Sequence, residues 1–101
     1  MLVPPKNFMR GLRKLTEEYG IIFADDEIQA GMARTGKMFA IEHFNVEPDL
    51  IIVGKAVGGG MPVSAVVGRE EILDSALPQT YFSSYAAHAL SLRAAIATIE
   101  F

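Results

Sequence analysis

One lysine stands where an apolar strand is expected to end, and a run of glycines follows it closely. Residues 50–53 read Leu-Ile-Ile-Val, Lys55 comes two positions later, and residues 58–60 are all glycine. A buried ammonium has to be paired, neutralised or consumed covalently, so this position favours a chemical role. The structural alternative is a strand-end lysine that extends into solvent before an ordinary glycine turn.

Acidic side chains follow a second apolar run, upstream of the first. Residues 21–24 read Ile-Ile-Phe-Ala and lead into Asp25, Asp26 and Glu27. Both runs are typical of strands buried on two faces, and helical patterns surround them. This alternation predicts an α/β fold with a mainly parallel sheet flanked by helices.

Ligands of open α/β sheets bind at the carboxyl ends of the strands, which is where Asp26 and Lys55 are expected to lie. The two side chains are therefore predicted to face one pocket. A salt bridge between them is one interpretation, although a buried ion pair is a weak argument for stability. The other is pyridoxal phosphate chemistry, in which a lysine amine forms an imine with the cofactor aldehyde and a carboxylate keeps the pyridine nitrogen protonated.

Four stretches of the chain, in order, carry a family pattern. The chain closely resembles the class III (ω-amino acid) aminotransferases, which are fold-type I pyridoxal phosphate enzymes, over residues 26–40, 42–43, 47–49 and 54–62. The similarity extends to the 4-aminobutyrate, acetylornithine and ornithine aminotransferases. It implies that residues 1–101 form part of the large cofactor-binding domain, truncated at both ends.

The resemblance also implies a role for each matching residue. Lys55 would form the Schiff base and carry the later proton transfers, and Asp26 would contact the pyridinium nitrogen. Ile28 would pack under the ring, and Gln29 would bind the phenolic oxygen. Ser84 stands where related enzymes place a threonine that binds the cofactor phosphate of the neighbouring subunit, and a serine hydroxyl can make the same hydrogen bonds.

Local geometry adds three expectations around this motif. Asp25 is a rival for the pyridine role, but the Asp-Glu-aliphatic-Gln register matches Asp26. In an extended segment Asp26 and Ile28 share a face, so Gln29 reaches the same site only if the chain bends after the strand. Ala33 stands where the family has glycine, at a cost of roughly 1 kcal/mol or more if that position has φ > 0.

The expected reaction is transfer of an amino group from an amino acid or ω-amine to a 2-oxo acid, with pyridoxal 5'-phosphate as cofactor. An amino acid racemase of the same fold is an alternative, because the same intermediate can be reprotonated on its other face. A third possibility is a non-catalytic remnant that self-associates. The sequence does not discriminate among them, since the residues expected to select the substrate lie outside the chain.

The composition limits the metals and macromolecules that the protein is expected to bind. The 101 residues include no cysteine and only two histidines, His43 and His88, so a metal centre is not expected. The net charge of −3 argues against nucleic-acid binding. No apolar run approaches ~18 residues and no signal peptide opens the chain, so no membrane contact and a cytoplasmic location are expected. By resemblance, the protein is expected to be a homo-oligomer built on a dimer.

Helical periodicity marks the elements around the two strands. One apolar stripe begins after Pro4-Pro5 and ends at Gly20, and another lies near the end of the chain. Both stripes are predicted to face the core. Their members are Phe8, Leu12, Leu15 and Tyr19 in the first helix and Leu92, Ile96 and Ile99 in the last.

Overall fold

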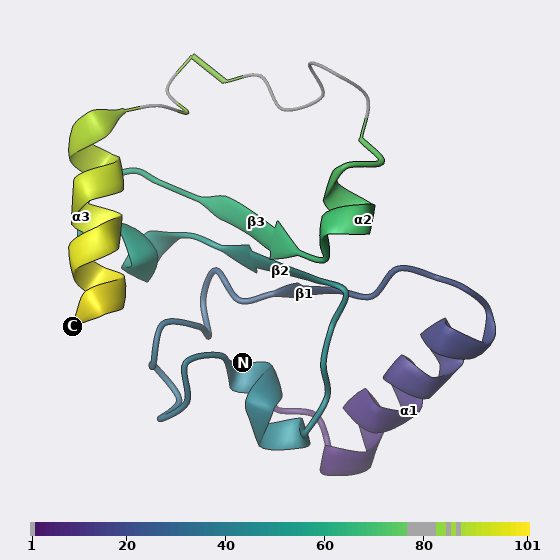
Figure 1. The fold of residues 1–101 in the computed structure, drawn as a ribbon. Helices are drawn as coiled ribbons and strands as arrows, with labels where there is room; N and C mark the ends of the chain where they lie inside the picture. Colours follow the sequence, from purple (N-terminus) through teal and green to yellow (C-terminus); the bar gives the residue numbers. More distant parts are fainter. Residues whose placement is uncertain (1, 77–82, 85, 87) are drawn as a thin grey trace.

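The computed structural model describes residues 2–76, 83, 84, 86 and 88–101. The elements alternate between helix and strand along the chain (Figure 1). They are α1 (Lys6–Glu18), β1 (Ala24–Asp26), the 3-10 helix η1 (Ala40–Phe44), β2 (Leu50–Val53), the 3-10 helix η2 (Lys55–Gly58), β3 (Ala65–Gly68), α2 (Glu70–Leu73) and α3 (Ala89–Glu100).

A three-stranded sheet in the order β1-β2-β3 forms the centre of the described part. β1 and β2 are parallel, whereas β2 and β3 are antiparallel. The predicted α/β class is confirmed, but the sheet is mixed rather than mainly parallel. Residues 54–64 join β2 to β3, and this connection is too short for the helical crossover of a dozen or more residues that parallel strands need.

The first strand begins later than predicted. Hydrogen-bonded pairing with β2 starts at Ala24, opposite Leu50, so the apolar residues Ile21 and Ile22 precede the strand and are exposed. Phe23 is buried, and its carbonyl oxygen accepts hydrogen bonds from the backbone N–H groups of Asp49 and Leu50. Most of the apolar run therefore precedes β1, and Asp25 and Asp26 lie within the strand.

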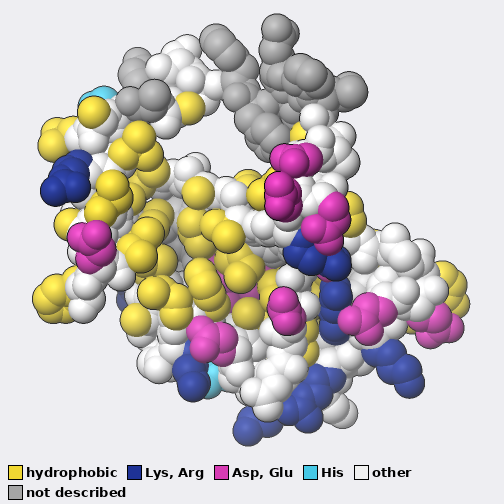
Figure 2. Space-filling model, in the orientation of Figure 1, with side chains coloured by type: hydrophobic (Ala, Val, Ile, Leu, Met, Phe, Trp, Pro, Cys, Tyr) yellow, Lys and Arg dark blue, Asp and Glu magenta, His cyan; other side chains and the backbone are white. Residues whose placement is uncertain are grey.

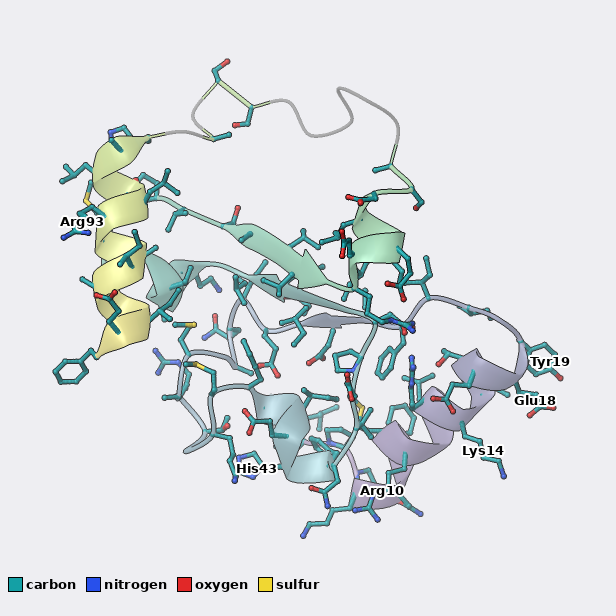
Figure 3. All side chains as sticks on the ribbon, viewed as in Figure 1. Arg10, Lys14, Glu18, Tyr19, His43 and Arg93 are labelled. Atoms are coloured by element: carbon teal, nitrogen blue, oxygen red, sulfur yellow. The ribbon has the colours of Figure 1, made fainter. Side chains whose placement is uncertain are left out.

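The two helical stripes do not face the core, contrary to the prediction. α1 buries Thr16 and α3 buries Ser91, and the apolar stripes lie largely on the outer surfaces. Tyr19 points away from the sheet in Figure 3, and hydrophobic side chains gather over α3 and the sheet in Figure 2. The main packing partner of α1 is η1 and that of α3 is η2, so neither stripe is covered by the sheet. The buried hydrophobic residues are Phe23, Ile41, Val53 and Val57.

A buried carboxylate ties four segments together. Asp49, just before β2, is 4% exposed. Its Oδ2 accepts hydrogen bonds from Arg13 Nη1 of α1 at 2.7 Å and from the Phe23 N–H at 2.8 Å, and its Oδ1 accepts one from Arg69. These contacts, above all the hydrogen bond from Arg13, lower the pKa of Asp49 to about 2.

We expect Asp49→Ala to lower the free energy of unfolding by about 3 kcal/mol, because removing one partner of a buried ion pair leaves the others unpaired. Urea unfolding measures the loss. Glu17→Ala is the matched control: Glu17 pairs with the same Arg13 at the surface, so about 0.5 kcal/mol is expected. Because the folded pKa of Asp49 is depressed, its contribution is complete above about pH 4 and lost towards pH 2. Equal losses in the two variants would contradict this account.

Ala33 has φ 63, a left-handed conformation that disfavours a side chain. The condition for the expected cost, a positive φ at Ala33, is therefore met. We expect Ala33→Gly to raise the free energy of unfolding by about 1 kcal/mol, as read from urea denaturation. Ala97→Gly, on the exposed side of α3, should instead lower it by about 1 kcal/mol. Destabilisation by both substitutions would show that the turn tolerates Ala33 without strain.

Candidate active site at the carboxyl ends of two parallel strands

Lys55 begins η2, directly after the end of β2 and Gly54. Its φ of 46° lies in the left-handed region, which non-glycine residues seldom adopt. Such a conformation costs of order 1–3 kcal/mol and persists where the surroundings impose it, often at functional sites. The side chain is exposed, so it is accessible to a ligand.

A cavity of about 480 Å³ opens beside this lysine. Its wall combines the end of β1, the end of β2, the segment before β3 and the segment before α3. The lining residues are Ile28, Gly54, Lys55, Pro62, Val63, Ser64, Ser83 and Ala86. A Cβ at Gly54 would lie 3.5 Å from Ile28 Cγ1, an ordinary van der Waals contact, so Gly54 and the Ile28 side chain are neighbours at the pocket wall.

Gln29 reaches Lys55 across the gap between the two strand ends. The Lys55 ammonium donates a hydrogen bond to Gln29 Oε1. The required bend is present: β1 ends at Asp26, and a run of turns starts at Ile28. The Gly31 N–H donates to the Glu27 carbonyl at 2.9 Å, which closes the first of these turns. The predicted bend after the strand is confirmed, and it brings Gln29 to the lysine.

Asp26 lies at the same edge of the sheet as Lys55. In the parallel register Asp26 is opposite Ile52, three positions before the lysine. Its Oδ1 accepts a hydrogen bond from the Ile28 N–H at 3.0 Å, and the side chain is exposed. Lys55 lines the cavity, whereas Asp26 is not among the lining residues, so the structure does not bring both side chains to one pocket wall.

Asp25, the rival acid, has a different environment. It is half-buried, and successive strand residues point to opposite faces, so it does not share a face with Asp26. Burial first, and then the neighbouring Glu27 carboxyl, raise the pKa of Asp25 to about 7. An acid that holds its proton near neutrality is poorly suited to pair with a cationic ring nitrogen.

Ser84 lies in a turn before α3 and is exposed. Its neighbours Ser83 and Ala86 line the cavity, whereas Ser84 does not. The adjoining positions 85 and 87, which belong to the expected phosphate-binding frame, lie outside the described residues. The expected contact of Ser84 with a phosphate of the neighbouring subunit remains a prediction.

Two glycines of the run, Gly58 and Gly59, allow neighbouring side chains to pack closely against η2. A Cβ at Gly58 would lie 2.9 Å from Val63 Cγ1, and one at Gly59 would lie 2.9 Å from Thr98 Oγ1 of α3. Gly59 also has φ 55. These glycines let η2 approach α3 and the segment before β3, and so fix the backbone that carries Lys55.

The residues that the structure describes form neither a metal site nor a membrane-spanning helix. Within them, no set of three or more histidine, cysteine, aspartate or glutamate residues is placed to hold a metal ion. None of their helices has the length and apolar character needed to cross a membrane.

Sequence reasoning missed part of the site. Val63 and Ser64 line the pocket but were not predicted, although they directly follow the motif that ends at Pro62. The placement of Asp25 and Glu27 on one face was also missed. Its signal was present, since acids at i and i+2 of a strand share one face.

The fold and the site together define an α/β protein with a strained lysine and an acid at neighbouring strand ends, beside a pocket. The family model for class III aminotransferases matches residues 1–101, and the chain belongs to this family. The chain is 49% identical over 100 residues to a leucine/methionine racemase from Thermococcus litoralis. It is 46% identical over 99 residues to a probable 4-aminobutyrate aminotransferase from Bacillus subtilis.

These alignments take in 99% and 98% of the chain but 23% of each relative, so the chain spans about a quarter of their length. A solved structure of the ornithine aminotransferase from Toxoplasma gondii matches 97% of this chain with a TM-score of 0.91 and 31% identity, over 23% of its own length. That structure is described as having partial occupancy of PLP at its active site. The predicted family is confirmed.

Proposed function

We propose that this chain supplies the lysine-bearing part of the active site of an aminotransferase that uses pyridoxal 5'-phosphate. Residues 1–101 would belong to its large cofactor-binding domain. The reaction would transfer an amino group from an amino acid or ω-amine to a 2-oxo acid. The observation that carries the proposal is the hydrogen bond from Lys55, which lines the cavity, to Gln29. Asp26 lies at the carboxyl end of the neighbouring parallel strand.

The side chains at and near the cavity fit the chemical groups of pyridoxal phosphate. Lys55 offers an amine that can hold an aldehyde covalently, and Asp26 offers a carboxylate for a ring nitrogen. Ile28 gives the pocket an apolar wall, and Gln29 has an amide that can bind a phenolic oxygen. When bound, pyridoxal phosphate supplies an electron sink that stabilises negative charge at the substrate Cα.

Each residue then has a distinct task. Asp26 would keep a proton on the ring nitrogen by its negative charge. Lys55 would remove the proton from the substrate Cα and deliver it to another carbon, as a positioned general base and acid. Gln29 would orient the lysine amine between these steps, because its Oε1 already accepts the ammonium hydrogen bond. In a dimer, the Ser84 hydroxyl would hydrogen-bond to the phosphate of the cofactor bound by the partner subunit.

Racemisation is the second candidate, and the relatives give it specific support. Besides the leucine/methionine racemase, an alanine/serine racemase from Pyrococcus horikoshii is 58% identical over 74 residues. The same proton removal by Lys55 would lead to racemisation if another donor, such as water, delivered a proton to the opposite face of Cα. The two reactions therefore differ in where the proton is delivered.

One assay separates the candidates. The complete product of the gene that carries this chain is incubated with pyridoxal phosphate and single L-amino acids or ω-amines, with and without a 2-oxo acid. An aminotransferase consumes donor and acceptor in equal amounts and needs the acceptor. A racemase forms the D-amino acid without any acceptor, as chiral chromatography would show. No turnover with either protocol would favour the non-catalytic, self-associating remnant.

A further inference from the structure

The side chains of Asp25, in β1, and Glu27, directly after β1, lie on the sheet face opposite to Asp26. Asp25 and Glu27 are two residues apart in the extended segment, so their side chains share a face. Glu27 is only 2% exposed, and Asp25 is half-buried. The Glu27 N–H continues the strand pairing by donating to the Ile52 carbonyl at 2.9 Å. The backbone that carries the pair is therefore bonded to β2, and the two side chains lie on the sheet face opposite to Asp26.

The hydrogen bonding of this pair is incomplete when both carboxyls are ionised. Glu27 Oε1 accepts a hydrogen bond from the Ile41 N–H of η1 at 2.8 Å. The other oxygen, Glu27 Oε2, and Asp25 Oδ2 are both buried and find no donor among the described residues. Two adjacent buried anions without donors are costly, because each is desolvated and repels the other. A single proton placed between the two oxygens satisfies both, since a protonated carboxyl is a donor and a carboxylate is an acceptor.

We propose that Asp25 and Glu27 share one proton, as a carboxylic acid–carboxylate hydrogen bond that ties the end of β1 to η1. Asp25 carries the proton and donates it towards Glu27, while Glu27 stays ionised and holds the Ile41 N–H. The segment between Glu27 and η1 includes Gln29, so the pair fixes both ends of the loop that carries this candidate site residue. The inference stands on two carboxyl oxygens that are buried without a donor on one face of the same extended segment, and it does not depend on the proposed cofactor.

The surrounding charges agree with this protonation. Burial, and then the neighbouring Glu27 carboxyl, raise the pKa of Asp25 to about 7, and the charge of Asp26 adds to the effect. β2, which pairs with β1, contains no titratable side chain. The titratable groups of η1 are engaged elsewhere: Glu42 accepts from the Phe39 N–H, and His43 contacts Thr35. No cation from these elements offsets the repulsion within the pair.

The shared proton makes stability depend on pH in a defined window. Because the folded pKa of Asp25 lies above the 3.8 of an unperturbed aspartate, the folded protein binds more protons than the unfolded chain between about pH 4 and 7. The stabilisation is complete below pH 4, is lost as the pH rises towards 7, and is absent above it. This window is separate from that of Asp49, which lies between about pH 4 and 2.

Two amide variants of the complete gene product test the proposal. In Asp25→Asn and Glu27→Gln, an amide N–H replaces the shared proton, so the hydrogen bond survives but no longer titrates. Infrared difference spectra at pH 5.5 should show a protonated-carboxyl carbonyl band in the wild type that both variants lack. The wild-type band should fade as the pH rises through about 7.

Unfolding gives an independent readout. Between pH 4 and 7, the unfolding equilibrium constant of the wild type relative to either variant should rise with pH by up to about tenfold per unit, the slope for one proton. Asp74→Asn, at an exposed aspartate, is the control and should follow the wild type. A midpoint for the Asp25 carboxyl near 4, or a protonated-carboxyl band that persists in both variants, would overturn the proposal. If Asp25→Asn does not fold, Glu27→Gln alone decides.

Discussion

Replacing Lys55 by arginine is expected to lower the turnover of the complete gene product by about 10²–10⁴-fold, the usual contribution of a positioned acid–base group. Arginine keeps the positive charge but cannot be deprotonated in proteins, so it can neither bind an aldehyde nor move a proton. The hydrogen bond to Gln29 requires only a cationic donor and can survive the change. Steady-state kinetics of whichever reaction the wild type catalyses, amino-group transfer or racemisation, measure the loss.

Lys14→Arg is the matched control for this substitution. Lys14 lies on α1 and points away from the sheet (Figure 3), so its replacement should leave turnover within a factor of about two. A Lys55→Arg enzyme with turnover close to that of Lys14→Arg would show that Lys55 is not the reacting amine.

Asp26→Asn is expected to lower turnover by about 10–10³-fold while the cofactor still binds. An adjacent carboxylate favours a protonated ring nitrogen by about 1–3 pKa units, and the neutral amide removes this effect. The amide retains an oxygen that can accept the hydrogen bond from the Ile28 N–H, so the local turn should persist. Turnover and cofactor affinity, measured separately by assay and by absorbance titration, distinguish loss of chemistry from loss of binding.

The neighbouring acid is the control for Asp26. Asp25→Asn keeps a hydrogen bond to Glu27 on the opposite face of the strand and should leave turnover near the wild-type value. If Asp25→Asn instead produces the large loss and Asp26→Asn does not, the acid has been assigned to the wrong residue.

Local patterns predicted the elements that carry the site. The strand at residues 50–53 has the predicted bounds, and the parallel pairing of β1 with β2 places Asp26 and Lys55 at one edge, as expected from strands joined through an intervening helical segment. The need for a bend before Gln29 also followed from strand geometry, and the structure contains it. These features depend on short-range periodicity, which the sequence records directly.

Features that depend on distant partners were not predictable. The antiparallel direction of β3 depends on how the glycine-rich connection folds, and the exposure of Phe8 and Ile96 depends on which surfaces cover the helices. The cluster around Asp49 joins residues 13, 23, 49 and 69, which no local pattern relates. Periodicity identifies an apolar helix face, but it does not identify the surface that covers it.

Covalent trapping is the most direct test of the central assignment. The complete gene product is incubated with pyridoxal 5'-phosphate and reduced with borohydride, which converts the bond between a lysine amine and the cofactor aldehyde into a stable link. Peptide mapping then locates the label. Our account predicts one main labelled peptide, carrying the group on Lys55, and its loss in Lys55→Arg. A main label on Lys6, Lys14 or Lys37, unchanged by Lys55→Arg, would contradict it.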